Sequence, residues 1–394
     1  MKLFQRLLVA PAALGLLAPI SATATEVNLN DVSNYSEGDM GISTKSFKPL
    51  STKNPLLAGG EGAAHDHSDD FDADSFSSTV VASFAADFAI GSVDGLPSNG
   101  QGASGQDKVA MVYGYEVELT TTFTGNDSLD VVLEGGNSTT QLTELDLSKG
   151  STANRMTIGG ISYNFPLGDK TNIFFGNNVA GTELYNTACV YGAATDTLSD
   201  CGTSSSNFDQ EFGTAAGLNY TNGDFSVAIG YEGQGQGSEG LMSKEGTDAY
   251  GAQLAYTGNN YGVSASISRI ETSQTDDDTF TGINAFYAPD NVNFPSISIG
   301  YEWGDDGSAA DTADETSQYF VGVQWDDVIA GTFGAALGTK TPTVEGNDDR
   351  LMYEAYYAYP VSDGLTVTPI VYVKENSGAT DDETGMILKT SFRF

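Results

Sequence analysis

Histidine is nearly absent from this chain of 394 residues, which contains only His65 and His67. No histidine therefore lies between residue 76 and the last residue. This absence excludes Ser-His-Asp, Cys-His and histidine-ligated metal catalysis from that segment. The sequence also has no Walker loop and no dinucleotide fingerprint beside a predicted helix. We therefore expect neither an enzyme nor a bound cofactor or metal.

Long hydrophobic runs are also missing. The first residues combine two basic side chains with an apolar stretch from Leu7 to Ile20 and small residues ending at Ala24. This pattern predicts a signal peptide over residues 1–24. A membrane-spanning helix is the weaker alternative, because the run is short and contains two prolines. No run of about 18 apolar residues follows. If the exported chain spans a membrane, a closed β-barrel is the solution that satisfies its backbone groups.

Basic residues are scarce. The chain has 16 lysines and arginines against 53 aspartates and glutamates, and its net charge is −37. The predicted signal peptide holds Lys2 and Arg6 but no acid, so the mature chain is more acidic still. Such a charge argues against nucleic acid and anionic lipid as partners. It fits acidic surface loops or an acidic lumen.

Only two cysteines are present, Cys189 and Cys201. In an exported chain two nearby cysteines predict a local disulfide. Closing a loop of this size stabilises by roughly 3 kcal/mol in the chain-entropy model. A zinc site is the weaker alternative, because no histidine lies near.

Residues 25–75 differ in composition from the rest and are rich in Ser, Asp, Gly and Asn. We interpret them as a flexible N-terminal segment. His65 and His67 stand among carboxylates there and could bind a metal, although a solvated tail is the favoured interpretation.

From residue 76 to residue 394 the chain alternates apolar with small or polar residues, in segments of about ten. Residues 261–268 (YGVSASIS) show the pattern. Period two predicts β-strands with one apolar and one polar face. An apolar exterior facing lipid and a wet interior explain both faces. The predicted strands are 76–91, 109–124, 129–136, 154–165, 171–180, 211–221, 225–232, 248–257, 261–270, 279–288, 296–304, 317–326, 331–340, 350–359, 365–374 and 384–394.

The predicted fold is therefore all-β, a transmembrane antiparallel β-barrel of about sixteen strands over 76–394. A soluble secreted β-sandwich would also alternate, with its apolar face inward. Three features favour the barrel. Aromatic residues flank short turns, as Tyr220 and Phe225 do. Short and long connections alternate. The last strand alternates up to Phe394, which is typical of the signal read by the barrel-assembly machinery.

Three segments resemble a known family. Residues 1–19 (MKLFQRLLVAPAALGLLAP) resemble the leader of major outer-membrane porins from marine cyanobacteria. Residues 121–129 (TTFTGNDSL) resemble their hairpin T-S-F-T-G-x-D-x-L, and residues 163–169 (YNFPLGD) resemble their hairpin Y-x-F-P-x-G-D. The chain is thus similar to the carbohydrate-selective (OprB-type) porin family over the leader and most of 76–394. It departs from that family in 25–75, where no S-layer-homology domain is present.

The resemblance implies an outer-membrane porin that passes sugars or inorganic ions. The barrel register places twelve charged residues on the inward face as candidate pore-lining groups. They are Asp87, Glu116, Glu118, Asp130, Glu134, Glu232, Glu302, Glu354, Lys340, Lys374, Lys389 and Arg393. Because acids outnumber bases, we expect the pore to favour cations.

The longest predicted outer loop, residues 181–210, holds both cysteines and is the third in order. In sixteen-stranded porins the third loop narrows the lumen, so its acids are candidate constriction residues. They are Glu183, Asp196, Asp200 and Asp209, with the neighbouring Glu211.

We expect passive diffusion of small hydrophilic solutes through a protein of the cell outer membrane. Its expected partners are membrane lipid, the solute, the assembly machinery and two further copies in a homotrimer. A structural barrel with little transport is the alternative.

Overall fold

The computed structural model describes residues 80–95, 108–137, 142–145, 147, 154–208, 213–234, 240–243, 246–271, 277–291, 293–305, 307, 315–376 and 381–394. The chain divides into two units, Met1–Gly59 and Gly60–Phe394, and every described residue belongs to the second. The predicted signal peptide, the segment 25–75 with both histidines, Asp209 and Glu211 lie outside the described residues.

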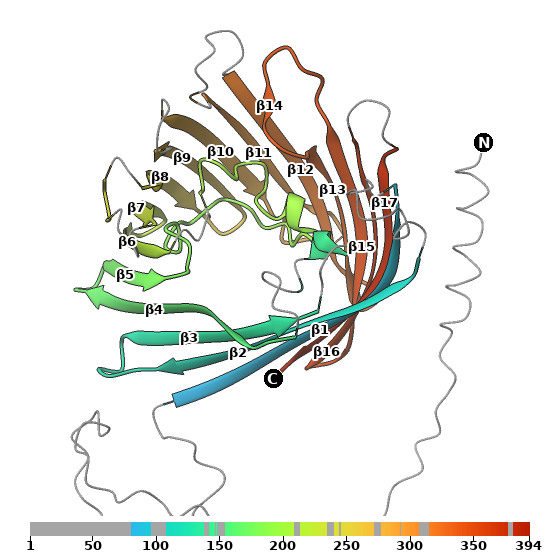
Figure 1. The fold of residues 1–394 in the computed structure, drawn as a ribbon, viewed down its shortest axis with the longest axis horizontal. Coiled ribbons are helices and arrows are strands. Elements are labelled where there is room, and N and C mark those ends of the chain that lie inside the picture. The colour runs from blue at the N-terminus through green and yellow to red at the C-terminus, as the bar shows by residue number, and fades with distance from the viewer. Residues whose placement is uncertain are drawn as a thin grey trace, which may run out of the picture. The chain divides into compact units, whose positions relative to one another are not determined.

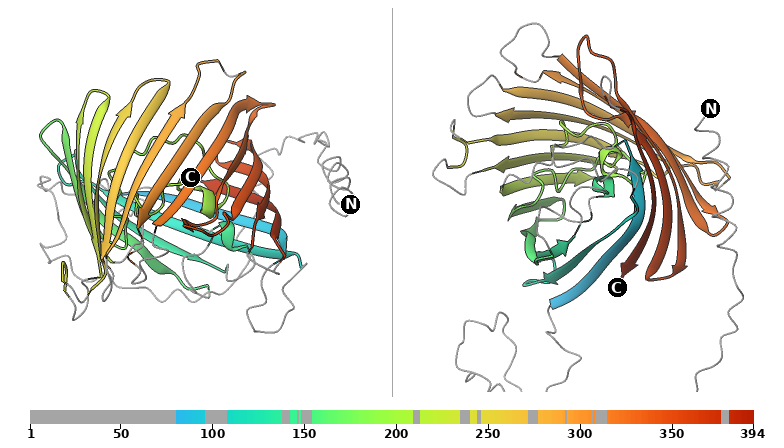
Figure 2. Two further views of the ribbon diagram at one scale, coloured as in Figure 1. Left: turned by 90° about the horizontal axis from the view of Figure 1, so that it is seen from above. Right: turned by 45° about the vertical axis from the view of Figure 1, so that its right-hand side comes forward.

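The described strands form one antiparallel sheet that closes on itself (Figures 1 and 2). They are β1 (Val80–Asp94), β2 (Ala110–Thr121), β3 (Ser128–Gly136), β4 (Thr157–Leu167), β5 (Thr171–Asn177), β6 (Thr214–Asn222), β7 (Phe225–Gly233), β8 (Asp248–Thr257), β9 (Tyr261–Glu271), β10 (Asp278–Tyr287), β11 (Ser296–Asp305), β12 (Glu315–Val328), β13 (Gly331–Thr339), β14 (Thr343–Val344), β15 (Leu351–Ser362), β16 (Leu365–Lys374) and β17 (Glu383–Arg393). Because β14 has two residues, the other sixteen form the barrel predicted from the sequence.

The first and last strands close the barrel. β1 pairs with β17 from Ala85 opposite Arg393 to Asp94 opposite Thr384. The N–H of Phe84 donates to the carbonyl oxygen of Phe394, and the N–H of Phe394 donates back, at 2.7 and 3.0 Å. The alternating C-terminal segment therefore removes the last free edge, which a strand in lipid cannot leave unpaired.

Side chains alternate between the two faces of the sheet as the sequence predicts. In β9, Val263 and Ile267 are 48% and 56% exposed, whereas Ser264 and Ser266 are 1% and 2% exposed. A β-sandwich would bury the valine and the isoleucine. The apolar face points outward, so the sandwich interpretation is wrong and the exterior suits lipid.

In the described connections between strands lie two short 3-10 helices, η3 (Thr143–Leu145) after β3 and η4 (Asp196–Leu198) after β5. Within the part of the chain that the structure describes, no helix is long and apolar enough to cross a membrane. The buried apolar cluster lies inside the ring of strands, where Leu142, Leu145 and Leu198 pack with inward residues such as Phe320 and Met352.

The two hairpin motifs that carry the family resemblance contact each other. Asp127, in the turn between β2 and β3, accepts a hydrogen bond from the hydroxyl of Tyr163 in β4 at 2.6 Å. Its other oxygen accepts from the hydroxyls of Thr122 and Thr124 and from the N–H groups of Phe123 and Thr124. These hydrogen bonds, that of Tyr163 foremost, hold the pKa of Asp127 well below its usual range.

Replacing Asp127 with Asn should loosen this turn, because an amide lacks the charge and offers one acceptor oxygen instead of two. The pKa of Asp127 is lower in the folded protein than in the unfolded protein, where it is about 3.9. The ionised carboxylate therefore stabilises the folded state at pH values above about 3.9. This stabilisation is lost as the pH falls through the folded pKa. We therefore expect the protection of the amides of residues 122–125, relative to their intrinsic exchange rate at the same pH, to fall on acidification and in the variant at neutral pH. Asp169→Asn in the exposed β4–β5 turn is the control. Equal protection in both variants would contradict the assignment.

Candidate functional site

The connection between β5 and β6, residues 178–213, is called loop 3 below. Its described part 178–208 enters the barrel (the green segment inside the ring in Figure 1). Its outgoing arm, residues 186–194, turns every second N–H to the wall. These groups donate to side chains on β8, β9, β11, β12 and β15 in turn. The pairs are Asn186 to Gln253 (2.6 Å), Ala188 to Ser264 (2.9 Å), Val190 to Ser298 (3.0 Å), Gly192 to Gln324 (3.0 Å) and Ala194 to Glu354 (3.1 Å).

The returning arm, residues 199–208, lies along the same wall. The N–H of Ser206 donates to Glu302 of β11 at 2.6 Å, and the side-chain amide of Asn284 donates to the carbonyl oxygen of Cys201 at 3.0 Å. The hydroxyl of Ser268 donates to the carbonyl oxygen of Ser205 at 2.7 Å. Inward polar side chains thus satisfy the backbone of a chain that has no strand to pair with.

Glycines on the inward face let loop 3 lie flat against the wall. A Cβ atom at Gly300 in β11 would collide with the carbonyl oxygen of Cys201. A Cβ atom at Gly230 in β7 would collide with the carbonyl oxygen of Gly181. Any larger residue at these positions would push the loop into the lumen.

A disulfide joins the two arms of loop 3. Cys189 on the outgoing arm and Cys201 on the returning arm are bonded, with Cα atoms 6.5 Å apart. The predicted pairing is therefore confirmed. Since the arms run side by side along the wall, the bond fixes their spacing.

A second connection also enters the barrel. Residues 137–156 between β3 and β4 are called loop 2, of which 142–145 and 147 form the inward part that the structure describes. Leu142, Leu145 and Leu147 are buried in the apolar cluster. Burying one leucine stabilises by about 1.5–3 kcal/mol relative to its exposed state. These three side chains therefore hold loop 2 inside.

The strand register places eleven of the twelve predicted pore-lining residues at inward positions, and Lys340 lies just after β13; their surroundings differ. Glu116 is exposed, and Glu118, Asp130 and Lys389 are partly exposed. Arg393 and Asp87 form an ion pair of 3.0 Å. Lys374 pairs with Glu144 of loop 2, and Lys340 donates to Asn376 at 2.7 Å. Glu134 is buried beside a cavity of about 230 Å³ that Asp87, Glu116, Leu145 and Leu147 also line.

Three of the twelve contact loop 3. Glu232, Glu302 and Glu354 are 0%, 1% and 4% exposed. Glu232 accepts from the N–H of Gly181, and Glu302 accepts from the N–H of Ser206. Their carboxylates face the loop backbone. These three acids therefore hold the loop in place, whereas the sequence had suggested that they contact the solute.

Glu354 contacts the end of the outgoing arm most extensively. Besides the N–H of Ala194, it accepts from the hydroxyl of Tyr191 at 2.7 Å and from the hydroxyl of Thr195 at 2.5 Å. Burial and then the charge of Glu354 raise the pKa of Tyr191, so this hydroxyl keeps its proton and donates.

The described constriction candidates are exposed. Glu183, Asp196 and Asp200 lie on loop 3 with solvent-accessible side chains. Burial, and then the nearby charge of Lys374, lower the pKa of Lys340, which lies just after β13. This lysine and the two aspartates line one cavity of about 200 Å³ between loop 3 and β12–β13. Loop 3 therefore brings acids and one base together.

Sequence reasoning missed the acceptors that hold loop 3, namely Gln253, Ser264, Ser298 and Gln324. It also missed Glu144 of loop 2, which joins the two loops. A signal was present, because inward serines, glutamines and glycines recur on neighbouring strands. That pattern alone does not say which connection covers it.

No protein-family model and no curated protein sequence matches the chain. Solved structures do resemble its fold. OprB of Pseudomonas putida gives a TM-score of 0.53 at 12% identity, covering 80% of this chain and 94% of that one. The loop L8 deletion mutant of OmpT, an outer membrane protein of Vibrio cholerae, gives 0.54 at 10% identity, covering 80% and 100%. A porin refined at 1.8 Å resolution gives 0.51 at 15% identity, with the same coverage.

These likenesses show the class of fold. The chain is a closed, sixteen-stranded antiparallel β-barrel of the porin type. OprB is among the porins that share this architecture with it.

Protein isolated without reductant should contain the peptides of Cys189 and Cys201 linked. Opening the bond by Cys189→Ser with Cys201→Ser should weaken the closed arrangement of loop 3 by up to roughly 3 kcal/mol. Mass spectrometry checks the linkage, and amide exchange of residues 186–206 checks the weakening. Free thiols in the isolated protein would be the opposite result.

Glu354→Gln should loosen the end of the outgoing arm, because an amide replaces one acceptor oxygen with a donor. Losing one hydrogen bond of typical net strength corresponds to exchange roughly five-fold faster at the amides of residues 191–195. Glu118→Gln, on the accessible inward face, is the matched control. An altered ion selectivity with unchanged exchange would assign Glu354 to solute contact instead.

Proposed function

We propose that the protein is an outer-membrane porin through which small hydrophilic solutes diffuse passively. The observation that carries the proposal is a barrel that is apolar outside and polar inside, with an extended loop hydrogen-bonded to its inner wall. Barrels of 16–18 strands leave an aqueous channel, and a loop fixed inside sets the channel width. The function is transport without an energy source and without catalysis.

The same proposal places the protein in the cell outer membrane, in contact with lipid through its apolar exterior. We propose membership of the carbohydrate-selective (OprB-type) porins of cyanobacteria, because the two hairpin motifs that resemble that family contact each other through Asp127 and Tyr163. The C-terminal strand, which closes the barrel, would be read by the assembly machinery. A homotrimer belongs to this proposal. Sugars and inorganic ions are the solute classes.

Cation preference is part of the proposal and depends on the accessible inward charges. With Glu232, Glu302 and Glu354 under loop 3, the exposed or partly exposed acids are Asp87, Glu116, Glu118 and Asp130. Lys389 and Arg393 oppose them, and Arg393 is paired with Asp87. The remaining excess of acid on β2 and β3 gives a negative potential that concentrates cations.

Neutralising Glu116 and Glu118 together as glutamines should lower the cation-to-anion permeability ratio. Reversal potential across a planar bilayer under a salt gradient measures that ratio. The effect should shrink as salt rises, because the screening length is about 8 Å at physiological ionic strength. Glu345→Gln on the exposed β13–β15 connection is the control. Anion preference of the unmodified protein at low salt would refute the acidic-lumen explanation.

A structural barrel with little transport is the second candidate. Loop 2 and loop 3 both occupy the lumen, and an apolar cluster joins them to the wall, which favours this alternative. Reconstitution separates the two, because a porin gives conductance steps in a bilayer and swelling of liposomes in small sugars. Well-folded protein that gives neither would have the structural role.

A further inference from the structure

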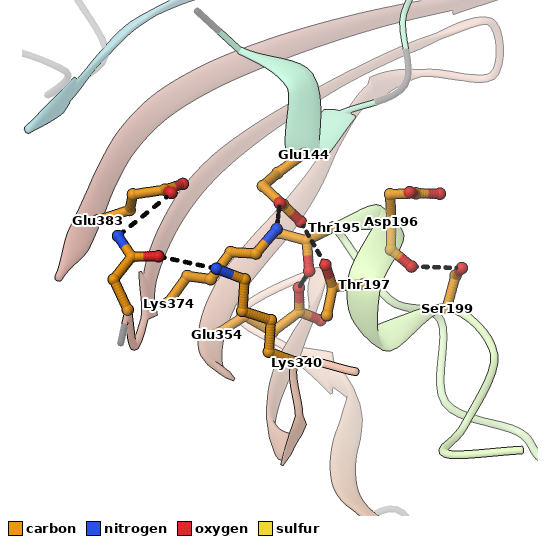
Figure 3. Close-up of polar contacts among 10 residues, drawn as sticks. Glu144, Thr195, Asp196, Thr197, Ser199, Lys340, Glu354, Lys374 and Glu383 are labelled. Carbon is orange, nitrogen blue, oxygen red and sulfur yellow. Dashed lines mark hydrogen bonds and ion pairs between the residues drawn. The ribbon is translucent and has the colours of Figure 1, made fainter. Parts of the chain in front are cut away.

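Among the residues that the structure describes, the carboxylate of Glu144 joins loop 2 to loop 3 by a hydrogen bond, beside the apolar cluster in which leucines of both loops pack. Glu144 of η3 accepts a hydrogen bond from the hydroxyl of Thr197 in η4 at 2.8 Å and forms an ion pair with Lys374 of β16 (Figure 3). The carboxylate is buried, with its side chain 5% exposed. One oxygen therefore faces the wall and the other faces the turn where loop 3 reverses direction.

Contacts of loop 2 with the barrel wall fix the position of Glu144. The leucines on both sides of it belong to the apolar cluster, and Gly114 of β2 provides room for the backbone of loop 2. A Cβ atom at Gly114 would collide with the carbonyl oxygen of Leu147. Lys374 holds the carboxylate from the wall, and Lys340 lies beside it within hydrogen-bond reach of Asn376. Loop 2 thus presents a fixed acceptor to the turn of loop 3.

Glu144 contacts loop 3 at its turn. The outgoing arm is bound to the wall by Glu354 at Ala194 and Thr195, and the returning arm is bound by Asn284 at Cys201. Between them, Leu198 reaches the apolar cluster, while the polar side chain of Thr197 points to Glu144. Among the described contacts of Thr197, this hydroxyl is the link that joins the turn to another loop.

We propose that Glu144 is a positioning residue that fixes the turn of loop 3 and thereby sets the width and solute size limit of the pore. The constriction then consists of two loops, loop 3 along the wall and loop 2 as the support of its turn. This inference rests on the proposed porin function for its effect on solutes. Its structural part, the coupling of the two loops, is independent of transport.

Thr197→Val tests the link, because it keeps the side-chain shape and removes only the hydroxyl that reaches Glu144. Thr182→Val is the matched control, since that hydroxyl donates to the carbonyl oxygen of Phe208 within loop 3 and does not reach loop 2. Lys374→Met removes the ion pair that holds the carboxylate at the wall and should have the same effects as Thr197→Val. Lys374→Arg keeps the positive charge and should behave like the unmodified protein.

Two readouts are compared in the full-length reconstituted protein. The first is amide exchange of residues 194–201, which should become roughly five-fold faster in Thr197→Val and stay unchanged in Thr182→Val. The second is liposome swelling with sugars of increasing size, together with single-channel conductance. The size limit should shift to larger sugars, and conductance should rise, in Thr197→Val and Lys374→Met alone, with strand exchange unchanged.

The outcomes separate the two proposals. If the unmodified protein does not conduct, the porin function fails, while faster exchange in Thr197→Val still supports the loop coupling. If the protein conducts and Thr197→Val matches Thr182→Val in exchange, size limit and conductance, the positioning role of Glu144 is wrong. A Lys374→Met variant that leaves the turn as protected as in the unmodified protein would overturn it as well.

Discussion

The central constraint in this structure is that an unpaired chain inside a barrel must still satisfy its backbone N–H groups. Loop 3 meets it by donating alternate N–H groups to inward side chains on five strands of the same wall. An unmet buried N–H costs about 1–3 kcal/mol, so the serines, glutamines and glutamates at these inward positions determine where the loop lies. Without them the connection would remain in solvent above the barrel, and the lumen would be wide.

The barrel itself was predictable, because period-two alternation depends only on neighbouring residues. The predicted limits 248–257 and 365–374 coincide with β8 and β16, since turn residues bound both segments clearly. β14 was missed because two residues are too few to show a period. Its pairing with Thr316 and Ser317 of β12 follows from the course of a connection.

The roles of the inward acids were less predictable. The alternation of side chains along a strand places Glu302 and Glu354 inside the barrel, and the structure agrees with that placement. This alternation gives no information about whether water, solute or another segment of the same chain lies against them. That depends on contacts between residues far apart in sequence, and the same limit explains why Glu144 was missed. The hairpin motif was informative for a local reason, since Asp127 organises its own turn.

The route of loop 3 also has a consequence for the order of folding. Its contacts join residues separated by 108, 132 and 160 positions in the chain, and such distant contacts form late because long stretches of chain must be ordered first. The strands β11, β12 and β15 must be in place before the outgoing arm has anything to bind. A nascent barrel that has closed through β1 and β17 but not yet received the loop would have a wider lumen than the finished protein. The disulfide, which ties the two arms together over only 12 residues, requires none of those strands. It can therefore form beforehand, so that the loop enters as one preassembled unit and the interval in which the lumen is open is shortened.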